Sequence, residues 1–193
     1  MSTPRVDTVR LQRLARAYRE SATLMAAVEL GLFTRIAGGA DTRVRLAEAL
    51  DVSPLNAERL VTACVALGLL LRDGDRLRNA PDVERFLVEG RPDYAGPWIL
   101  FTKPDCQDWG RLAEHLRRKE PPSVLGKNTN LTVDAARRYH QATYSIGMGA
   151  GRRFVRQVDL SPRRHLLDLG GGSGCYCIVA AQAHPELRAV VLD

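Results

Sequence analysis

The 193-residue sequence predicts a mainly α N-terminal domain followed by the start of an α/β domain with a parallel sheet. Two observations lead to this fold class. Apolar residues recur at helical spacing through most of the chain up to about residue 158. Residues 164–193, in contrast, have the pattern of an apolar strand, a glycine-rich turn, a helix and a second apolar strand.

The composition is that of a globular protein, with 45% hydrophobic and 26% charged residues. No apolar run reaches the roughly 20 residues that a membrane-spanning helix needs, and the N-terminus lacks the apolar centre of a signal peptide. We therefore expect a cytoplasmic protein with no membrane partner. The net charge is +6, but the basic residues are mostly arginines interleaved with acids, which indicates a solvated surface without a nucleic-acid partner. The four cysteines lack metal-ligand spacing, so we expect structural thiols and no metal site.

Residues 7–36 carry apolar side chains at helical spacing, with one break around residues 19–21. Two amphipathic helices fit this pattern. The first has few neighbours in sequence. Its apolar stripe is therefore expected to pack on another subunit or to fold back on the body of the protein.

Two further helices are predicted from their start signals. Asp41 or Thr42 is a candidate cap for a helix over residues 43–50. Ser53 followed by Pro54 is typical of a cap and a first helical position, so the next helix is expected to begin there.

A hairpin completes this region, because Asp73 and Gly74 lie between two short runs with strand character. Helix, turn, helix and hairpin is the order of a winged helix. In a basic protein this order raises a DNA-binding regulator as the alternative function. The second helix begins, however, with one acid, Glu58, beside one base, Arg59, and continues with apolar residues. That composition favours a structural or dimerising role.

Further helices are predicted between residues 81 and 120, with Trp98 and Trp109 as core anchors. The stretch "EPPSVLGKNTN" at 120–130 is the strongest break in the chain and is predicted to be a hinge or linker.

A long helix over about residues 133–158 contains three glycines, Gly147, Gly149 and Gly151. Each would cost about 1 kcal/mol relative to alanine in a helix interior. Three explanations stay open. A neighbouring helix packs closely on that face, a cofactor or substrate lies over it, or the helix is broken there.

The last segment carries the strongest functional pattern. The acid Asp168 lies near the end of the first strand, a loop rich in glycine follows, and Asp193 ends the second strand. Glycines let a ligand approach the backbone and the positive end of the following helix. An acid about 20 residues beyond the glycines is placed to accept hydrogen bonds from ribose hydroxyls. The loop glycines are Gly170, Gly171, Gly172 and Gly174.

The loop does not fit a dinucleotide fingerprint, because Cys175 or Cys177 falls where G-x-G-x-x-G needs its third glycine. A P-loop is excluded as well, since the G-K-[ST] sequence is missing. The motif present is D-x-G-x-G-x-G, which resembles the cofactor motif of class I S-adenosylmethionine-dependent methyltransferases. That cofactor carries a cationic ammonium and a sulfonium, so an acid beside the loop suits it.

The motif and the stretches "AAVELGLFTRIAGG", "LAEALDVSPLNAERLVTACVALGLL" and "DWGRLAEHLRR" together resemble the small-molecule O-methyltransferase family of caffeic-acid and acetylserotonin type, including its bacterial tailoring members. The resemblance implies S-adenosyl-L-methionine as cofactor and methyl transfer to a hydroxyl, or to a carbon, of a small secondary-metabolite acceptor. It also implies a homodimer formed through the N-terminal helices.

The resemblance implies site residues too. Gly170, Gly172 and Gly174, with Gly171 in the same loop, line the methionine part of the cofactor. Asp168 orders its polar end, and Asp193 holds the ribose. Where many members have F-N-x-x-M, this chain has "YHQAT" at residues 139–143, so the acceptor-facing surface differs from the usual one.

The catalytic base of the family is a histidine late in the nucleotide domain, which the resemblance locates beyond Asp193. Of the histidines present, His140 is the candidate for facing the pocket, whereas those at positions 115, 165 and 184 have the character of helix or strand boundary residues.

Three segments are expected. Residues 1–98 form a winged-helix-like dimerisation domain, residues 99–160 form connecting helices that line the pocket, and residues 161–193 form the first β-α-β unit of a Rossmann-like cofactor-binding domain. Two parallel strands cannot cover both faces of a sheet. We therefore expect the chain to be the N-terminal part of a longer enzyme, or to be broken after Asp193, with little turnover of its own.

Overall fold

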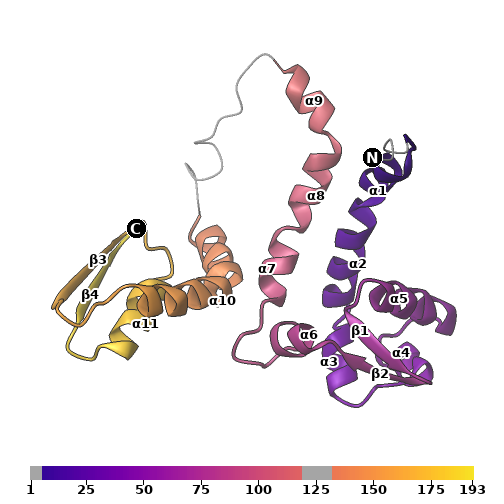
Figure 1. Ribbon diagram of the computed structural model, residues 1–193, viewed down its shortest axis with the longest axis horizontal. Coiled ribbons are helices and arrows are strands. Elements are labelled where there is room, and N and C mark those ends of the chain that lie inside the picture. Colours follow the sequence, from indigo (N-terminus) through magenta and orange to yellow (C-terminus); the bar gives the residue numbers. More distant parts are fainter. Residues whose placement is uncertain (1–5, 119–131) are drawn as a thin grey trace, which may run out of the picture. The chain divides into compact units, whose positions relative to one another are not determined.

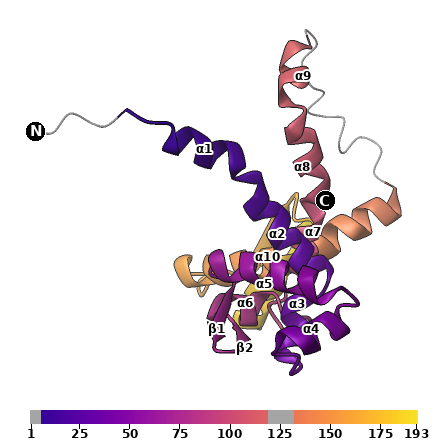
Figure 2. The same cartoon turned by 90° about the vertical axis from the view of Figure 1, so that its right-hand side faces the viewer.

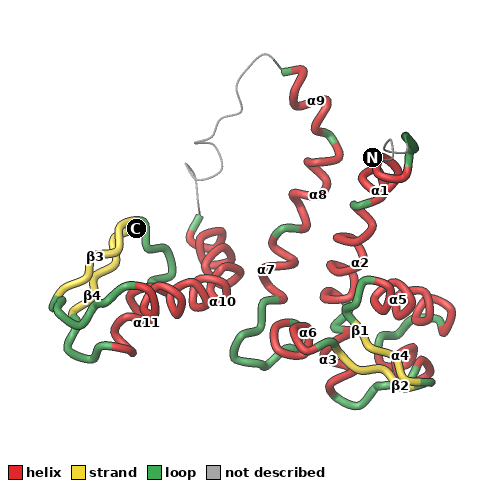
Figure 3. The backbone as a smooth tube through the Cα atoms, in the orientation of Figure 1, coloured by secondary structure: helices red, strands yellow, loops and turns green. Residues whose placement is uncertain are grey.

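The computed structural model describes residues 6–118 and 132–193, and the chain divides into two compact units, Met1–Arg91 and Pro92–Asp193 (Figure 1). Each unit contains one two-stranded sheet (Figure 3). The predicted linker at 120–130 lies outside the described residues. Within the described ranges, no helix has the length and apolar character that crossing a lipid bilayer requires.

The first unit begins with three helices where the sequence predicted two. They are α1 (Val9–Arg16), α2 (Tyr18–Glu29) and α3 (Leu32–Ala37). The break predicted around residues 19–21 is wrong, because α1 ends before Ala17 and α2 begins directly after it. A second break falls at Gly31, whose φ of 70° lies in the left-handed region that glycine adopts without a steric penalty.

Helix α1 extends away from the body of the first unit (Figure 2). All of its residues are described, and none of them is buried. Its apolar side chains and the following tyrosine are each more than half exposed; these are Val9, Leu11, Leu14 and Tyr18. Among the described residues of the first unit the stripe therefore does not fold back on the body, and its packing on another subunit stays a prediction.

The predicted start signals of the next two helices are confirmed. Helices α4 (Arg43–Ala49) and α5 (Pro54–Ala66) begin after capping side chains. The Thr42 hydroxyl accepts the Arg45 N–H at 3.5 Å, and the Ser53 hydroxyl accepts the Asn56 N–H at 3.2 Å. Each cap satisfies a backbone donor that the first helical turn leaves free.

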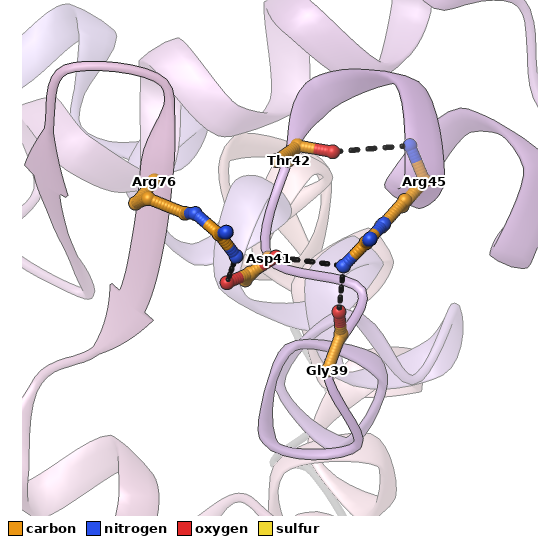
Figure 4. A network of polar contacts seen from close by, with 5 residues as sticks. All are labelled: Gly39, Asp41, Thr42, Arg45 and Arg76. Carbon is orange, nitrogen blue, oxygen red and sulfur yellow. Dashed lines mark hydrogen bonds and ion pairs between the residues drawn. The ribbon is translucent and has the colours of Figure 1, made fainter.

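The other candidate cap, Asp41, has a different role (Figure 4). Its carboxylate forms an ion pair with Arg76 and a second one with Arg45 at 3.5 Å. Arg45 also donates to the Gly39 carbonyl at 3.4 Å. The hydrogen bond from Arg76 lowers the pKa of the Asp41 carboxyl. This network ties the turn before α4 to the hairpin.

The hairpin consists of β1 (Leu70–Asp73) and β2 (Arg76–Asn79), which pair antiparallel with Asp73 opposite Arg76. The predicted hairpin is confirmed, but its turn lies one residue later than expected. Asp73 is the last residue of β1, and Gly74, with a φ of 57°, begins the turn.

The core of the first unit joins α3, α4, α5 and the hairpin. Its largest fully buried side chains are Phe33, Leu32, Leu46, Leu70, Val61 and Cys64. Burial raises the pKa of the Cys64 thiol to about 11, which fits the structural role predicted for it.

One polar side chain, Asn79, is buried beside this core. Its amide nitrogen donates to the Phe33 carbonyl at 2.9 Å and to the Glu84 carboxylate at 2.8 Å. Glu84 belongs to α6 (Pro81–Phe86) and also pairs with Arg91. The hydrogen bond from Asn79, and then Arg91, lower the pKa of the Glu84 carboxyl.

The second unit begins with three short helices, α7 (Gly96–Phe101), α8 (Lys103–Gly110) and α9 (Leu112–Arg117). The prediction that Trp109 is a core anchor is wrong, because this side chain is 70% exposed. Trp98 is half-buried, and its ring centroid lies 6.3 Å from that of Phe101.

Helix α10 (Val133–Gln157) is unbroken and packs along α11 (Cys175–Ala183) (Figure 1). A Cβ atom at Gly147 would lie 2.8 Å from the Cys175 sulfur, and one at Gly151 would lie 3.0 Å from the Cys175 carbonyl oxygen. The neighbouring helix therefore explains these two glycines. At Gly149 a Cβ would meet no atom within 4 Å in the described part of the chain, so close packing does not explain this glycine.

The predicted strand, turn, helix and strand at the end of the chain are confirmed. Strands β3 (His165–Leu169) and β4 (Arg188–Leu192) pair parallel, with α11 between them in sequence. On the inner face, Leu166 packs against a cluster of Leu160, Ala180 and Leu187.

The outer face of this sheet is open, although both strands were predicted to be buried. Its exposed apolar side chains are Leu167, Leu169, Val190 and Leu192, at 59, 69, 58 and 61%. Because side chains alternate across a strand, the helices that cover the inner face cannot reach these residues.

Candidate functional site

The glycine loop between β3 and α11 turns through three left-handed backbone positions. Gly170, Gly172 and Gly174 have φ values of 69°, 54° and 72°. The Gly170 N–H donates to the Leu192 carbonyl at 2.7 Å, which ties the start of the loop to β4. These φ values are ones that other residues adopt only with strain, so the loop geometry requires glycine at each of these positions.

Gly171 is required for a different reason, since its φ is not positive. A Cβ atom there would lie 2.7 Å from the carboxyl carbon and Oδ2 of Asp168 and 2.8 Å from a Val191 methyl group. A side chain at this position would therefore displace the acid. The sequence predicted the glycines as a group, and the structure separates those needed for backbone shape from the one needed for close packing.

Asp193 lies against the loop. Its Oδ2 accepts the Gly172 N–H at 2.7 Å, although the two residues are 21 positions apart in sequence. The parallel pairing of Leu169 with Leu192 explains this contact, because it brings the carboxyl ends of the two strands to the same edge of the sheet. The acid predicted to close the second strand is therefore adjacent to the predicted loop.

Asp168 has an unsatisfied carboxylate oxygen. Its Oδ2 is buried, and no residue in 6–118 or 132–193 forms a hydrogen bond with it. A buried acceptor left without a partner costs about 1–3 kcal/mol or more when it is charged. A ligand with a cationic N–H donor would remove this cost, so the orphaned oxygen marks a place for such a group.

His140 reaches the same loop from α10. A Cβ atom at Gly172 would lie 3.5 Å from Cε1 of the imidazole and 3.6 Å from Nδ1. This Nδ1 is buried, and it has no hydrogen-bond partner in the described part of the chain. The sequence singled out His140 only as a residue that could face the acceptor, and it was not among the predicted cofactor-binding residues.

All six predicted cofactor-binding residues lie together at one edge of the β3–β4 sheet. They are Asp168, Gly170, Gly171, Gly172, Gly174 and Asp193. Four of the five loop residues 170–174 are glycines, so the loop exposes mainly backbone, and Asp168 lies beside Gly171 while Asp193 bonds to Gly172. The described residues contain no group of three or more histidine, cysteine and acidic side chains that could hold a metal ion.

Cys175, the first residue of α11, packs inside the site. Its sulfur lies 3.1 Å from the Ser173 hydroxyl and 3.5 Å from the Tyr144 carbonyl of α10. The side chain is 3% exposed. These contacts make it a packing residue between α10 and α11, as expected for a structural thiol.

The comparisons with known proteins first define the class. The human N-acetylserotonin methyltransferase in complex with SAM has the same fold, with a TM-score of 0.80 and 24% identity, over 99% of this chain and 60% of that chain. Residues 12–88 match the O-methyltransferase dimerisation domain. The fold is therefore that of a methyltransferase with a helical dimerisation domain.

Two bacterial relatives define the family more closely. This chain is 33% identical to a 3-hydroxy-5-methyl-1-naphthoate 3-O-methyltransferase of Streptomyces sahachiroi, over 95% of this chain and 54% of the relative. It is 34% identical to a tetracenomycin polyketide synthesis 8-O-methyl transferase of Streptomyces glaucescens, over 94% of this chain and 55% of the relative. The chain is similar to these small-molecule O-methyltransferases, and it spans about half of their length.

Proposed function

We propose that the protein is an S-adenosylmethionine-dependent methyltransferase that methylates a hydroxyl, or a carbon, of a small secondary-metabolite acceptor. The observation that carries this proposal is the hydrogen bond between Asp193 and the Gly172 N–H, which joins an acid at a strand end to the glycine loop. The names of the bacterial relatives support a hydroxyl of an aromatic or polyketide compound as acceptor.

The residues of the site suit the parts of this cofactor. Asp193 uses one oxygen for the loop, and its carboxylate retains lone pairs that can accept both ribose hydroxyls. The unpartnered Oδ2 of Asp168 suits a cationic ammonium. The backbone of residues 170–174 provides the surface along which the methionine part lies.

When bound, the cofactor supplies an electrophilic methyl group carried on a sulfonium. Once the methyl group has left, the rest of the cofactor is a neutral thioether. The work left to the protein is to position the acceptor and to exclude water, because in-line geometry supplies much of the acceleration. We assign no residue of this chain as the base that deprotonates the acceptor.

We further propose that residues 1–98 form a winged-helix-like dimerisation domain that mediates a homodimer. The family match at 12–88 and the open apolar stripe of α1 support this role. In this reading, residues 99–160 connect it to the cofactor-binding part and line the pocket, and residues 161–193 form the first β-α-β unit of that part.

The arrangement of α4, α5 and the hairpin does not favour a DNA-binding alternative. At the start of α5, Glu58 accepts from Arg72 at 3.2 Å, and Arg59 donates to Asn56 at 3.2 Å. The basic groups at this helix end are therefore engaged within the chain. No observation in the described residues supports insertion of α5 into a DNA groove.

The cytoplasmic location of the protein stays a prediction.

Thermal unfolding with added ligands tests the proposed function. A ligand that binds only the folded state raises the melting temperature, and the shift grows with concentration. We expect a shift with S-adenosylhomocysteine and none with NAD. The Asp193→Ala variant should lose the shift, whereas Glu186→Ala, which removes an exposed acid from the same unit, should keep it. A shift with NAD alone would contradict the proposal.

A further inference from the structure

His140 shares a helix face with the two glycines that pack on α11. Spacings of seven and eleven residues to Gly147 and Gly151 are close to two and three helical turns. Because Gly147 and Gly151 contact Cys175 and Val179, that face of α10 is turned towards α11 and the loop before it. The position of His140 over Gly172 therefore follows from the packing of the two helices.

Two buried polar atoms flank consecutive residues of the loop without a partner in the described ranges. Oδ2 of Asp168 lies beside Gly171, and Nδ1 of His140 lies beside Gly172. Buried side-chain polar atoms are hydrogen-bonded in the large majority of cases. Two unsatisfied atoms beside one glycine loop indicate a ligand group that pairs with both.

The chemistry of the two atoms selects this group. A carboxylate oxygen only accepts hydrogen bonds, and the neutral imidazole accepts at Nδ1 when its proton is on Nε2. An ammonium has three N–H donors and can satisfy both acceptors, whereas a carboxylate of the ligand would be repelled by Asp168.

We propose that His140 is a positioning residue that accepts a hydrogen bond from the methionyl ammonium of the cofactor through Nδ1, next to Asp168. This inference rests on the proposed function, and it adds a contact from α10 to those of the loop and strands. It also explains why a polar ring lies over Gly172, where a packed side chain would otherwise be apolar.

Calorimetric titration with two ligands tests the inference. S-adenosylhomocysteine has the amino-acid end, and 5′-methylthioadenosine retains the adenosine and thioether but lacks that end. For His140→Phe we expect about tenfold weaker binding of S-adenosylhomocysteine, from the loss of one hydrogen bond to a charged group. Binding of 5′-methylthioadenosine should change by less than about twofold, because His140 does not contact the shared part of the two ligands.

Rescue by a conservative variant separates positioning from packing. In His140→Asn the side-chain oxygen branches from Cγ as Nδ1 does, so this variant should recover affinity to within about threefold of the wild type. His140→Leu, which has no acceptor, should behave like His140→Phe and replaces it if the larger ring prevents folding. Unliganded melting temperatures establish that each variant is folded.

The outcomes separate the two proposals. If wild-type protein binds neither ligand, the proposed function fails and this inference fails with it. If the wild type binds both ligands and His140→Phe and His140→Leu weaken neither of them, or weaken both equally, the inference alone is wrong. Loss of affinity in His140→Asn equal to that in His140→Leu would also overturn it.

Discussion

The surroundings of the two strand pairs differ in how many buried polar atoms have hydrogen-bond partners and in how far apolar side chains are buried. Around β1 and β2, Asp41 pairs with Arg76, and the buried amide nitrogen of Asn79 has two acceptors, leaving only its Oδ1 without a partner. Around β3 and β4, Oδ2 of Asp168 and Nδ1 of His140 are buried beside the glycine loop without partners in the described ranges.

The apolar groups differ in the same way. The core beside the hairpin encloses Phe33 and Leu46 almost completely, whereas the outer face of β3 and β4 leaves four apolar side chains more than half exposed. Unpaired polar atoms and open apolar surface cost stability. The hairpin region is therefore largely enclosed within the described residues, whereas the β3–β4 region leaves two buried acceptors unpaired and four apolar side chains exposed.

The largest effect is expected from the core beside the hairpin. Phe33 is 1% exposed, so Phe33→Ala should lower the free energy of unfolding by about 3–5 kcal/mol. Leu167→Ala, on the open face of β3, should cost less than about 1 kcal/mol because its side chain is 59% exposed. Urea unfolding of both variants measures the difference. Similar losses would contradict the proposed contrast between the two regions.

A smaller effect is expected where α10 meets α11. In Gly151→Ala the added Cβ would lie 3.0 Å from the Cys175 carbonyl, so we expect a loss of about 1–3 kcal/mol. The matched change Gly149→Ala meets no described atom within 4 Å and should stabilise the helix by up to about 1 kcal/mol. Thermal unfolding of the pair tests this, and destabilisation by Gly149→Ala would show that something covers this face.

The smallest effect concerns the pairing around the hairpin. Because Asn79 and Arg91 lower the pKa of Glu84 in the folded state, its contribution to stability is present above the ordinary glutamate pKa of about 4.3. That contribution is lost as the pH falls through the lowered folded-state value. We expect melting temperatures to fall less steeply between about pH 5 and about pH 3 in Glu84→Gln than in the wild type. An unchanged slope in Glu84→Gln, and also in Asn79→Ala, would show that this carboxylate is not stabilised by its partners.

Local signals in the sequence were enough to predict much of the fold. Two helices begin at caps whose contacts lie within four residues, namely Thr42 and Ser53, the latter followed by Pro54. The local sequence is therefore enough to predict where these helices start. The strand, glycine turn, helix and strand at the end of the chain also follow from local periodicity. The six residues proposed to bind the cofactor were singled out because the motif and the acid after the second strand lie at the two ends of this unit.

Features that depend on tertiary contacts were missed. The left-handed turn at Gly31 divides a continuous apolar pattern, which helical spacing alone cannot reveal. Trp109 has a large apolar side chain of the kind that usually lies in a core, but in α8 no described residue covers it, and it is 70% exposed. The location of His140 over the loop depends on how α10 packs against α11, although its spacing from Gly147 and Gly151 was a usable signal.

Hydrogen exchange measured with and without S-adenosylhomocysteine shows whether the glycine loop holds the cofactor, because it compares the two regions in one experiment. We predict slower exchange in peptides covering residues 168–176 and 190–193, where the loop and Asp193 would hold the ligand. Peptides covering residues 54–79 should exchange at unchanged rates. Protection confined to residues 54–79, or none anywhere at saturating ligand, would contradict the assignment of the glycine loop as the cofactor site.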